Sequence, residues 1–208
     1  MRIMYNNVCD TSGITLTESS ENSQYPAENV QNIHLTKTWR TATGSLSSQS
    51  IVFDAGAGNT FTADSCAILN HNLTNAATIK FQMHTADSWG TPDLDETLTW
   101  RSGVIAKYFT STSKRYMRFF FTDAGNTDNY IEVGRMFACA YLQVTPSSLL
   151  DFRITKVRTD NVKESIGNQM YSDQGVGYRE FRYRFPPTGT TMISSLDTMY
   201  DTIRRLYY

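Results

Sequence analysis

The sequence predicts a mainly β protein, and two features of the 208-residue chain lead to that class. Aromatic residues make up 12% of the chain, and Thr, Ser and Asn are frequent, which suits strands joined by polar loops. Segments such as Thr78 to His84 (TIKFQMH) alternate apolar and polar residues, a period that marks a strand with one face in a core. Charge-rich segments that favour helices are few.

The first distinctive segment is YPAENVQNIHLTKTWRT, which runs from Tyr25 to Thr41. Pro26 stands at an early helical position, where its missing N–H costs nothing, so we expect a short helix to begin here. Trp39 follows that helix and is expected to fill the core. The next strong signal is a strand at Ser50–Asp54 (SIVFD).

Further strands are predicted between this segment and residue 145, with turn residues in the connections. A long loop, DSWGTPDLD, is expected at residues 87–95. The two most hydrophobic stretches, RYMRFFFT and IEVGRMFACAYLQV, are joined by a turn rich in Asp, Asn and Gly. The expected strands cover residues 63–69, 78–84, 97–100, 106–110, 115–122 and 131–144.

The character of the chain changes after Thr145, so one domain is expected over residues 1–145 and a smaller element over residues 146–208. In the smaller element, residues 169–171 and 178–185 are predicted to form a hairpin, and a helix is predicted from residue 193. About three strands and one amphipathic helix are too small for a sound core. We expect this element to pack on another subunit or protein through Tyr178, Arg179, Phe181, Arg182, Tyr183, Arg184, Phe185, Ile193, Leu196, Tyr200 and Ile203.

The alternation of Arg and aromatic residues in YREFRYRF also suits single-stranded nucleic acid. The formal net charge of the whole chain is −1, which argues against a protein that binds by neutralising phosphates. A permanent protein interface needs the same half-apolar, Arg-rich strand, and the sequence favours that interpretation.

Composition restricts the class of protein further. The hydrophobic share of 40% is that of a globular protein, and no apolar run approaches the roughly 20 residues that span a bilayer. The N-terminal segment lacks the apolar region of a secretory signal, so we expect folding in a cytosol. Cys9, Cys66 and Cys139 are therefore expected to be reduced, and the last two to be buried.

Patterns that carry catalysis or bind metals are weak. The three histidines stand at no ligand spacing and beside no nucleophile, so we expect no metal centre, no cofactor and no enzymatic activity. Asp93 and Asp95 lie in the densest acidic cluster and are candidate cation ligands, although an acidic loop is normally solvated. Trp89, between Ser88 and Gly90 in the same loop, is the candidate contact for a ligand, with a lid or an interface anchor as the alternative.

Four segments of the first domain, YPAENV…TKTW, SIVFD, ILNHNL and IKFQ, resemble the galactose-binding-like (discoidin-like) jelly rolls. Together with TDNVKESIGNQMY…REFRYRF and the terminal helix, the layout is similar to structural proteins of the tailed-bacteriophage tail tip or baseplate, including distal-tail proteins. The order of the two parts is reversed relative to the usual distal-tail order. The resemblance implies a jelly-roll β-sandwich followed by a C-terminal hairpin and helix that dock and oligomerise.

The expected function is therefore that of a structural protein of a phage virion, made in the host cytoplasm and located in the tail. Its partners would be copies of itself in a ring and other tail proteins, with no nucleic acid and no membrane span. The alternative is a carbohydrate-binding module that contacts glycans of the host surface.

Overall fold

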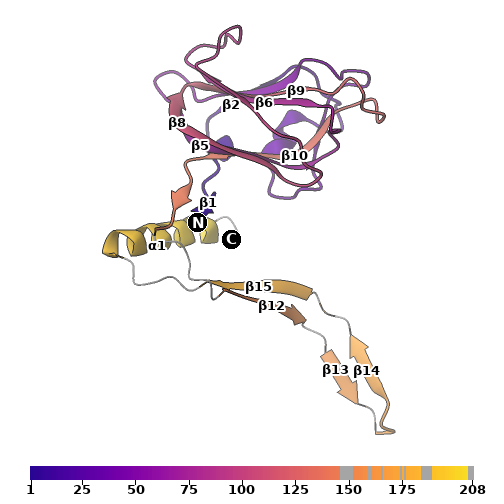
Figure 1. Ribbon diagram of the computed structural model, residues 1–208. Helices are drawn as coiled ribbons and strands as arrows, with labels where there is room; N and C mark the ends of the chain where they lie inside the picture. The colour runs from indigo at the N-terminus through magenta and orange to yellow at the C-terminus, as the bar shows by residue number, and fades with distance from the viewer. Residues whose placement is uncertain are drawn as a thin grey trace. The chain divides into compact units, whose positions relative to one another are not determined.

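The computed structural model describes residues 1–145, 152–158, 161–164, 166–173, 175, 177–183 and 189–205. The chain divides into two compact units, one of Met4–Leu142 together with the residues from Asp201 onward, and the other of Gln143–Tyr200 with Met1–Ile3. The first unit contains two antiparallel sheets that form the separate layers seen in Figure 1. This arrangement confirms the prediction of a mainly β sandwich.

One layer is a five-stranded sheet in the order β2-β4-β9-β6-β7. Its central strand β9 pairs with β4 on one side and with β6 on the other, and every pairing in the sheet is antiparallel. The strands are β2 (Thr15–Glu18), β4 (Gln49–Asp54), β6 (Thr78–His84), β7 (Leu94–Thr97) and β9 (Tyr116–Thr122).

The second layer is a four-stranded sheet in the order β3-β10-β5-β8. The long strand β5 pairs with β10 and β8, and a bulge between Ala63 and Ser65 shifts its register with β8. Such a bulge bends the strand and increases its twist. The strands are β3 (Trp39–Arg40), β5 (Phe61–His71), β8 (Ile105–Lys114) and β10 (Glu132–Cys139).

Aromatic side chains fill the space between the two sheets. Alternate residues of β9 point inward, so Phe119 and Phe121 are buried, and Phe119 packs edge-on against Phe81 of β6 with ring centroids 4.9 Å apart. Trp39 is fully buried, and its ring centroid lies 6.1 Å from that of Phe121. Its indole N–H donates to the carbonyl oxygen of Ser20. The prediction that Trp39 fills the core is confirmed.

The predicted short helix is present as the 3₁₀-helix η2 (Ala27–Gln31), with Pro26 at its N-cap. A second 3₁₀-helix, η1 (Val8–Asp10), precedes β2 and is capped by the side chain of Asn7. All three cysteines are free, as expected, and all three are buried, as expected for Cys66 and Cys139. Burial raises the pKa of the Cys66 thiol well above its ordinary value, so this group stays protonated and behaves as a small apolar residue.

Several strand limits differ from the predictions because pairing with distant strands sets where each strand begins and ends. Residues 98–100 form no strand, because β7 begins at Leu94 and pairs with Lys80–Met83 of β6. The apolar stretch 131–144 is divided, since β10 ends at Cys139 and β11 (Leu142–Gln143) pairs with β1 (Arg2–Ile3).

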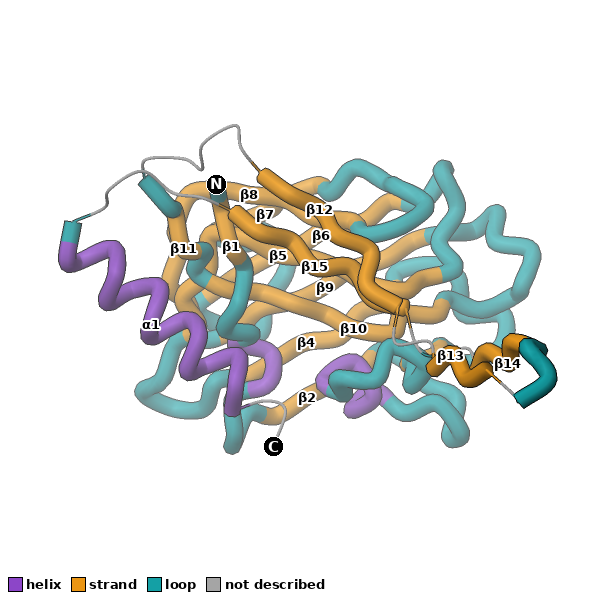
Figure 2. The backbone as a smooth tube through the Cα atoms, turned by 90° about the horizontal axis from the view of Figure 1, so that it is seen from below, coloured by secondary structure: helices purple, strands orange, loops and turns teal. Residues whose placement is uncertain are grey.

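The second unit contains two antiparallel ladders. The predicted hairpin between 169–171 and 178–185 is wrong: β14 (Met170–Asp173) pairs with β13 (Asn161–Glu164), and β15 (Gly177–Tyr183) pairs with β12 (Phe152–Arg158). The inner strands β13 and β14 are closest in the chain and pair with each other, which leaves β12 for β15 (Figure 2).

The predicted C-terminal helix is α1 (Thr190–Arg205). It is not long and apolar enough to cross a bilayer, and no helix elsewhere in the described residues is. Of the predicted interface residues, Arg184 and Phe185 lie outside the described residues, as do the side chains of Phe181 and Tyr183. Tyr178, Arg179, Arg182, Ile193 and Tyr200 are exposed, and Leu196 and Ile203 are half-buried.

Candidate functional site

A hollow of about 280 Å³ opens between the segment that leads into η2 and the turn that leads into β3. We call it the Tyr25 hollow. Both segments lie at the end of the sandwich where β2 ends and β10 begins, as the strand register shows. The hollow is lined by Gln24, Tyr25, Pro26, Asn29, Thr36, Lys37 and Thr38.

Two hydrogen bonds to backbone carbonyl oxygens fix the two walls of the Tyr25 hollow relative to each other. The N–H of Arg40 donates to the carbonyl oxygen of Tyr25 at 3.1 Å. The side-chain amide of Asn29, on η2, donates to the carbonyl oxygen of Thr38 at 2.9 Å. Because one bond lies on each side, the hollow is preformed rather than assembled by a mobile loop.

The ring of Tyr25 is held by a cation on one face. The guanidinium carbon of Arg40 lies 3.8 Å from the centroid of Tyr25 and 4.8 Å from that of Tyr130. Nε of Arg40 also lies 2.7 Å from Oε2 of Glu132, on β10, and forms an ion pair with it. Cation–π contacts of this kind orient an aromatic ring, so Tyr25 is a positioned platform.

One residue of the lining, Thr38, has a buried hydroxyl without a partner in the described part of the chain. Thr38 is only 2% exposed, and its Oγ1 makes no hydrogen bond with the described residues. Burying a hydroxyl unsatisfied costs about 1–3 kcal/mol, so most buried hydroxyls are paired. An aromatic ring in a hollow with polar lining residues suits a small polar ring whose one face is apolar.

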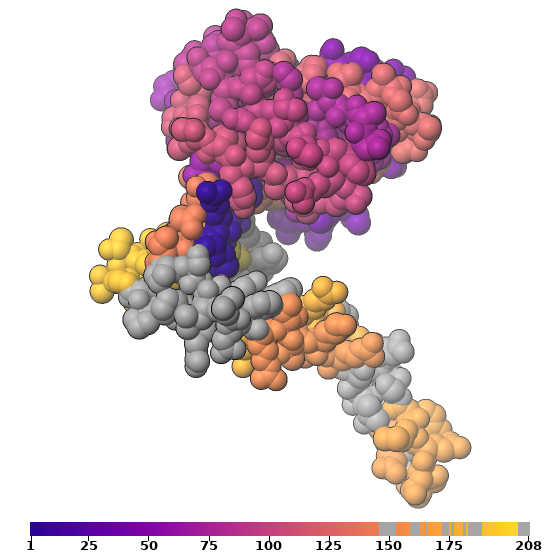
Figure 3. All heavy atoms as spheres, in the orientation of Figure 1, coloured from indigo at the N-terminus to yellow at the C-terminus, as the bar shows by residue number. Residues whose placement is uncertain are grey.

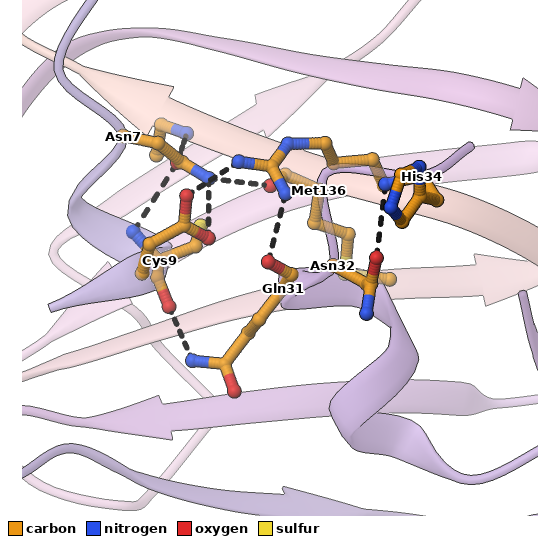
Figure 4. A network of polar contacts seen from close by, with 9 residues as sticks. Asn7, Cys9, Gln31, Asn32, His34 and Met136 are labelled. Carbon is orange, nitrogen blue, oxygen red and sulfur yellow. Dashed lines mark hydrogen bonds and ion pairs between the residues drawn. The ribbon is translucent and has the colours of Figure 1, made fainter. Parts of the chain in front are cut away.

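A buried polar network supports η2 from the side of the four-stranded sheet. Asn7 donates to the carbonyl oxygen of Met136, and Gln31 donates to that of Cys9 at 2.5 Å (Figure 4). Arg135 donates to the carbonyl oxygen of Gln31 at 2.8 Å and forms an ion pair with Asp10. This network fixes the C-terminal end of η2 and, through it, one wall of the Tyr25 hollow.

Burial raises the pKa of the Asp10 carboxyl, although the charge of Arg135 opposes the shift. Such a pair is unfavourable to break, because the remaining charge would be buried alone. Asp10 and Arg135 therefore have a structural role in supporting η2.

Trp89, the ligand contact predicted from the sequence, lies at the opposite end of the sandwich. Its loop follows the C-terminal end of β6, and its ring is half-buried over the five-stranded sheet. The indole N–H donates to Asp87 at 2.7 Å, and the guanidinium carbon of Arg118 lies 4.4 Å from the ring centroid. The structure does not bring Trp89 together with the Tyr25 hollow, and the role of Trp89 in binding stays a prediction.

The two candidate cation ligands are engaged by cationic side chains. Asp93 Oδ2 lies 2.8 Å from Nζ of Lys114 and 3.0 Å from Nδ1 of His84. Asp95 accepts from Lys80 at 2.9 Å and from Gln82 at 3.0 Å. Across the described ranges, no group of three or more His, Cys, Asp or Glu residues is arranged to hold a metal ion. The cation interpretation therefore gains no support.

Solved structures share the fold of the first unit. A family 32 carbohydrate-binding module of Clostridium perfringens, in complex with galactose, aligns with a TM-score of 0.50 and 15% identity, over 68% of this chain and 100% of that one. A second family 32 module produced by the same organism aligns with a TM-score of 0.50 and 15% identity, over 65% and 99% of the two chains.

A family 29 fucosidase of Ruminococcus gnavus, in complex with fucose, aligns with a TM-score of 0.50 and 13% identity, over 66% of this chain and 27% of that one. No family model and no curated protein matches the sequence. At these identities the likeness shows the fold alone. The chain contains a discoidin-like jelly-roll β-sandwich, which confirms the fold predicted from the sequence.

Sequence reasoning assigned Tyr25–Thr41 to architecture and did not select Tyr25, Asn29 or Thr38 as site residues. The available signal for a site was the segment itself, since it contains a polar turn between an apolar helix and a buried tryptophan. The contacts of Arg40 with Tyr130 and Glu132 join positions about ninety residues apart, and only the register of β10 with β3 reveals them.

Proposed function

We propose that the sandwich is a carbohydrate-binding module and that the Tyr25 hollow is its sugar site. The observation that carries the proposal is the positioned ring of Tyr25 in a hollow that is also lined by Asn29, Lys37 and Thr38. A sugar offers an apolar ring face to Tyr25 and hydroxyl groups to the polar lining. The Thr38 hydroxyl, which has no partner among the described residues and is closed to solvent in the free protein, would turn toward the hollow to bind it. The fold that the chain shares with a family 32 module solved in complex with galactose supports the proposal.

The proposed role is binding rather than catalysis. A glycosidase needs two carboxyl groups flanking the bond that breaks. The lining of the Tyr25 hollow contains no Asp or Glu, whereas it contains amide, hydroxyl and ammonium groups. These groups bind a neutral sugar without providing an acid and a base.

Isothermal titration calorimetry with a panel of neutral monosaccharides tests the proposal. Tyr25→Ala is expected to weaken binding at least tenfold, because it removes the ring platform and its contact with Arg40. Trp89→Ala is the matched control at the other end of the sandwich and is expected to leave that affinity unchanged. Affinity that depends on Trp89 and not on Tyr25 would place the sugar site at Trp89 instead of the Tyr25 hollow. Absence of binding to the whole panel would refute the carbohydrate-binding function.

We also infer a role in assembly for the helix of the second unit. Ile193 and Tyr200 are 49% and 62% exposed, so α1 presents large apolar side chains that a partner would cover. The finer assignment, a ring-forming component of a phage tail tip or baseplate, is supported by the sequence resemblance alone. The solved structures described above are carbohydrate-binding modules and a fucosidase.

Mass photometry of the full chain tests this second role. An oligomer that dissociates when Ile193→Ser and Tyr200→Ser are combined would support assembly through α1. A monomer at micromolar concentration, or an oligomer that the two substitutions leave intact, would refute it.

A further inference from the structure

The β12–β15 ladder, which we call the basic ribbon, carries an excess of positive charge on exposed strands. Its residues 152–158 and 177–183 contain five Lys or Arg residues and one acidic residue, Glu180, for a net charge of +4. Residues 1–142 contain ten Lys or Arg and thirteen Asp or Glu residues, a net charge of −3. Residues 143–208 as a whole contain nine Lys or Arg and seven Asp or Glu residues, a net charge of +2, so the excess of positive charge is concentrated in the basic ribbon.

Like charges stand directly opposite each other in the basic ribbon. The register pairs Arg153 with Arg182 and Lys156 with Arg179. Cross-strand pairs of like charge destabilise a ladder, and a two-stranded ladder alone is at best marginally stable. The ribbon thus maintains an electrostatic cost that an anion would remove.

Among the described residues, only one of these cations has an anionic partner. Nε of Arg182 lies 2.8 Å from Oε1 of Glu180, two residues away on the same strand. Within the described strands and loops, the other four form no ion pair, and all four are exposed: Arg153, Lys156, Arg158 and Arg179.

Apolar surface accompanies the charge. Ile154 is 51% exposed and Tyr178 is 54% exposed, one on each face of the basic ribbon. The described residues of both ladders lie at the surface of the second unit, in orange and yellow in Figure 3. Exposed Tyr and aliphatic groups between cations suit an extended ligand that is both anionic and partly apolar.

We propose that the basic ribbon binds an anionic carbohydrate polymer, one that carries carboxylate or sulfate groups on its sugar rings. The inference rests on the proposed carbohydrate-binding function. It adds a second, charge-dependent binding surface for carbohydrate besides the Tyr25 hollow. Lys156 and Arg158 are two residues apart on β12 and therefore point to the same face, about 6.6 Å apart along the strand. Two cations on one face of a strand can thus contact successive charged rings of an extended polymer.

Two other occupants fit less well. Double-stranded DNA carries one charge per about 1.7 Å, a density that four free cations spread over two faces of a ribbon do not match. Edge-to-edge pairing of two basic ribbons would bring further like charges together, so a second copy paired through these strands is also disfavoured.

The test measures binding of the full-length protein to polygalacturonate and to dextran sulfate by biolayer interferometry. The fully methyl-esterified galacturonan has the same backbone without charge and is the matched ligand. Binding to at least one anionic polymer is expected, and it should weaken roughly tenfold between about 50 mM and about 300 mM NaCl as the charges are screened. Binding to neither anionic polymer, or equal binding to the esterified one, would overturn the proposal.

Variants assign the contact to the ribbon. Lys156→Gln with Arg179→Gln removes a like-charged pair and is expected to weaken anionic-polymer binding at least tenfold, as is Arg153→Gln with Arg158→Gln. The control, Arg101→Gln with Lys163→Gln, removes two exposed cations outside the ribbon and should leave binding within twofold. Equal losses in all three variants would contradict the assignment, and circular dichroism verifies that each variant is folded.

Two further results separate this proposal from its rivals and from the sugar site. Tighter binding of a single-stranded oligonucleotide than of either anionic polymer would overturn the choice of ligand. Ribbon variants should leave monosaccharide affinity unchanged, and Tyr25→Ala should leave the salt-dependent contact in place. Failure of the Tyr25 hollow and failure of the basic ribbon are therefore observed independently.

Discussion

Replacement of Thr38 by Val should stabilise the free protein while it weakens the binding of sugar. Valine has nearly the shape of threonine but lacks the hydroxyl, which in the free protein is 2% exposed and unpartnered. Removing an unsatisfied buried hydroxyl recovers about 1–3 kcal/mol of desolvation cost. For a chain of this size, a gain of about 1 kcal/mol raises Tm by about 2–4 °C.

Thr41 provides the matched control three residues further along the chain. It is equally buried, but its hydroxyl oxygen accepts a hydrogen bond from the backbone N–H of Ile131 at 3.0 Å. Thr41→Val leaves that buried N–H without a partner and should destabilise the protein by about 1–3 kcal/mol. The same substitution at two neighbouring buried threonines is thus expected to have opposite signs.

Urea unfolding of both variants measures the two effects as shifts of the midpoint at constant m-value. In calorimetry, Thr38→Val should weaken the affinity for the sugar by about two- to twelvefold, the equivalent of about 0.5–1.5 kcal/mol for one hydrogen bond. If Thr38→Val destabilises the protein as Thr41→Val does, the Thr38 hydroxyl has a partner in the free protein and the argument for the site fails.

Further predictions concern two glycines and a histidine outside the Tyr25 hollow. Gly134→Ala would place a Cβ 2.7 Å from the carbonyl oxygen of Leu35 and 2.9 Å from Cβ of Asn70, so urea unfolding should show a loss of about 1–3 kcal/mol. Gly103→Ala meets nothing within 4 Å and should change stability by less than about 0.5 kcal/mol; equal effects would contradict the close approach. Burial lowers the pKa of His71, whose Nδ1 accepts from the N–H of Leu73, so the folded state disfavours the charged imidazole. Stability should be full above the ordinary His pKa of about 6.5 and should fall as the pH drops below it, whereas His71→Gln should flatten that part of the curve.

The sequence predicted those features of the fold that depend on local pattern. Alternation over Thr78–His84 gave a strand with the same limits as β6, and helical spacing of apolar residues gave α1. The pairing of β15 was predicted wrongly because alternation identifies a strand without identifying its partner. Register depends on contacts between distant segments, and the sequence of one strand contains no record of them.

The candidate site illustrates the same limit. Trp89 attracted attention because a tryptophan in a polar loop is conspicuous, yet the structure places Arg118 over its ring. The Tyr25 hollow consists of ordinary residues whose arrangement comes from the approach of η2, β3 and β10. The absence of a hydrogen-bond partner for the Thr38 hydroxyl among the described residues follows from the fold and cannot be read from the sequence.

The central claim is that a sugar binds in the Tyr25 hollow. A two-dimensional ¹H–¹⁵N NMR titration of the full chain with the tightest monosaccharide of the panel tests it most directly, because every backbone amide reports separately. The account predicts that the largest shifts occur at Tyr25, Asn29 and Thr38 and that the amides around Trp89 are unaffected. Shifts centred on Trp89, or a spectrum that no sugar of the panel changes, would contradict it.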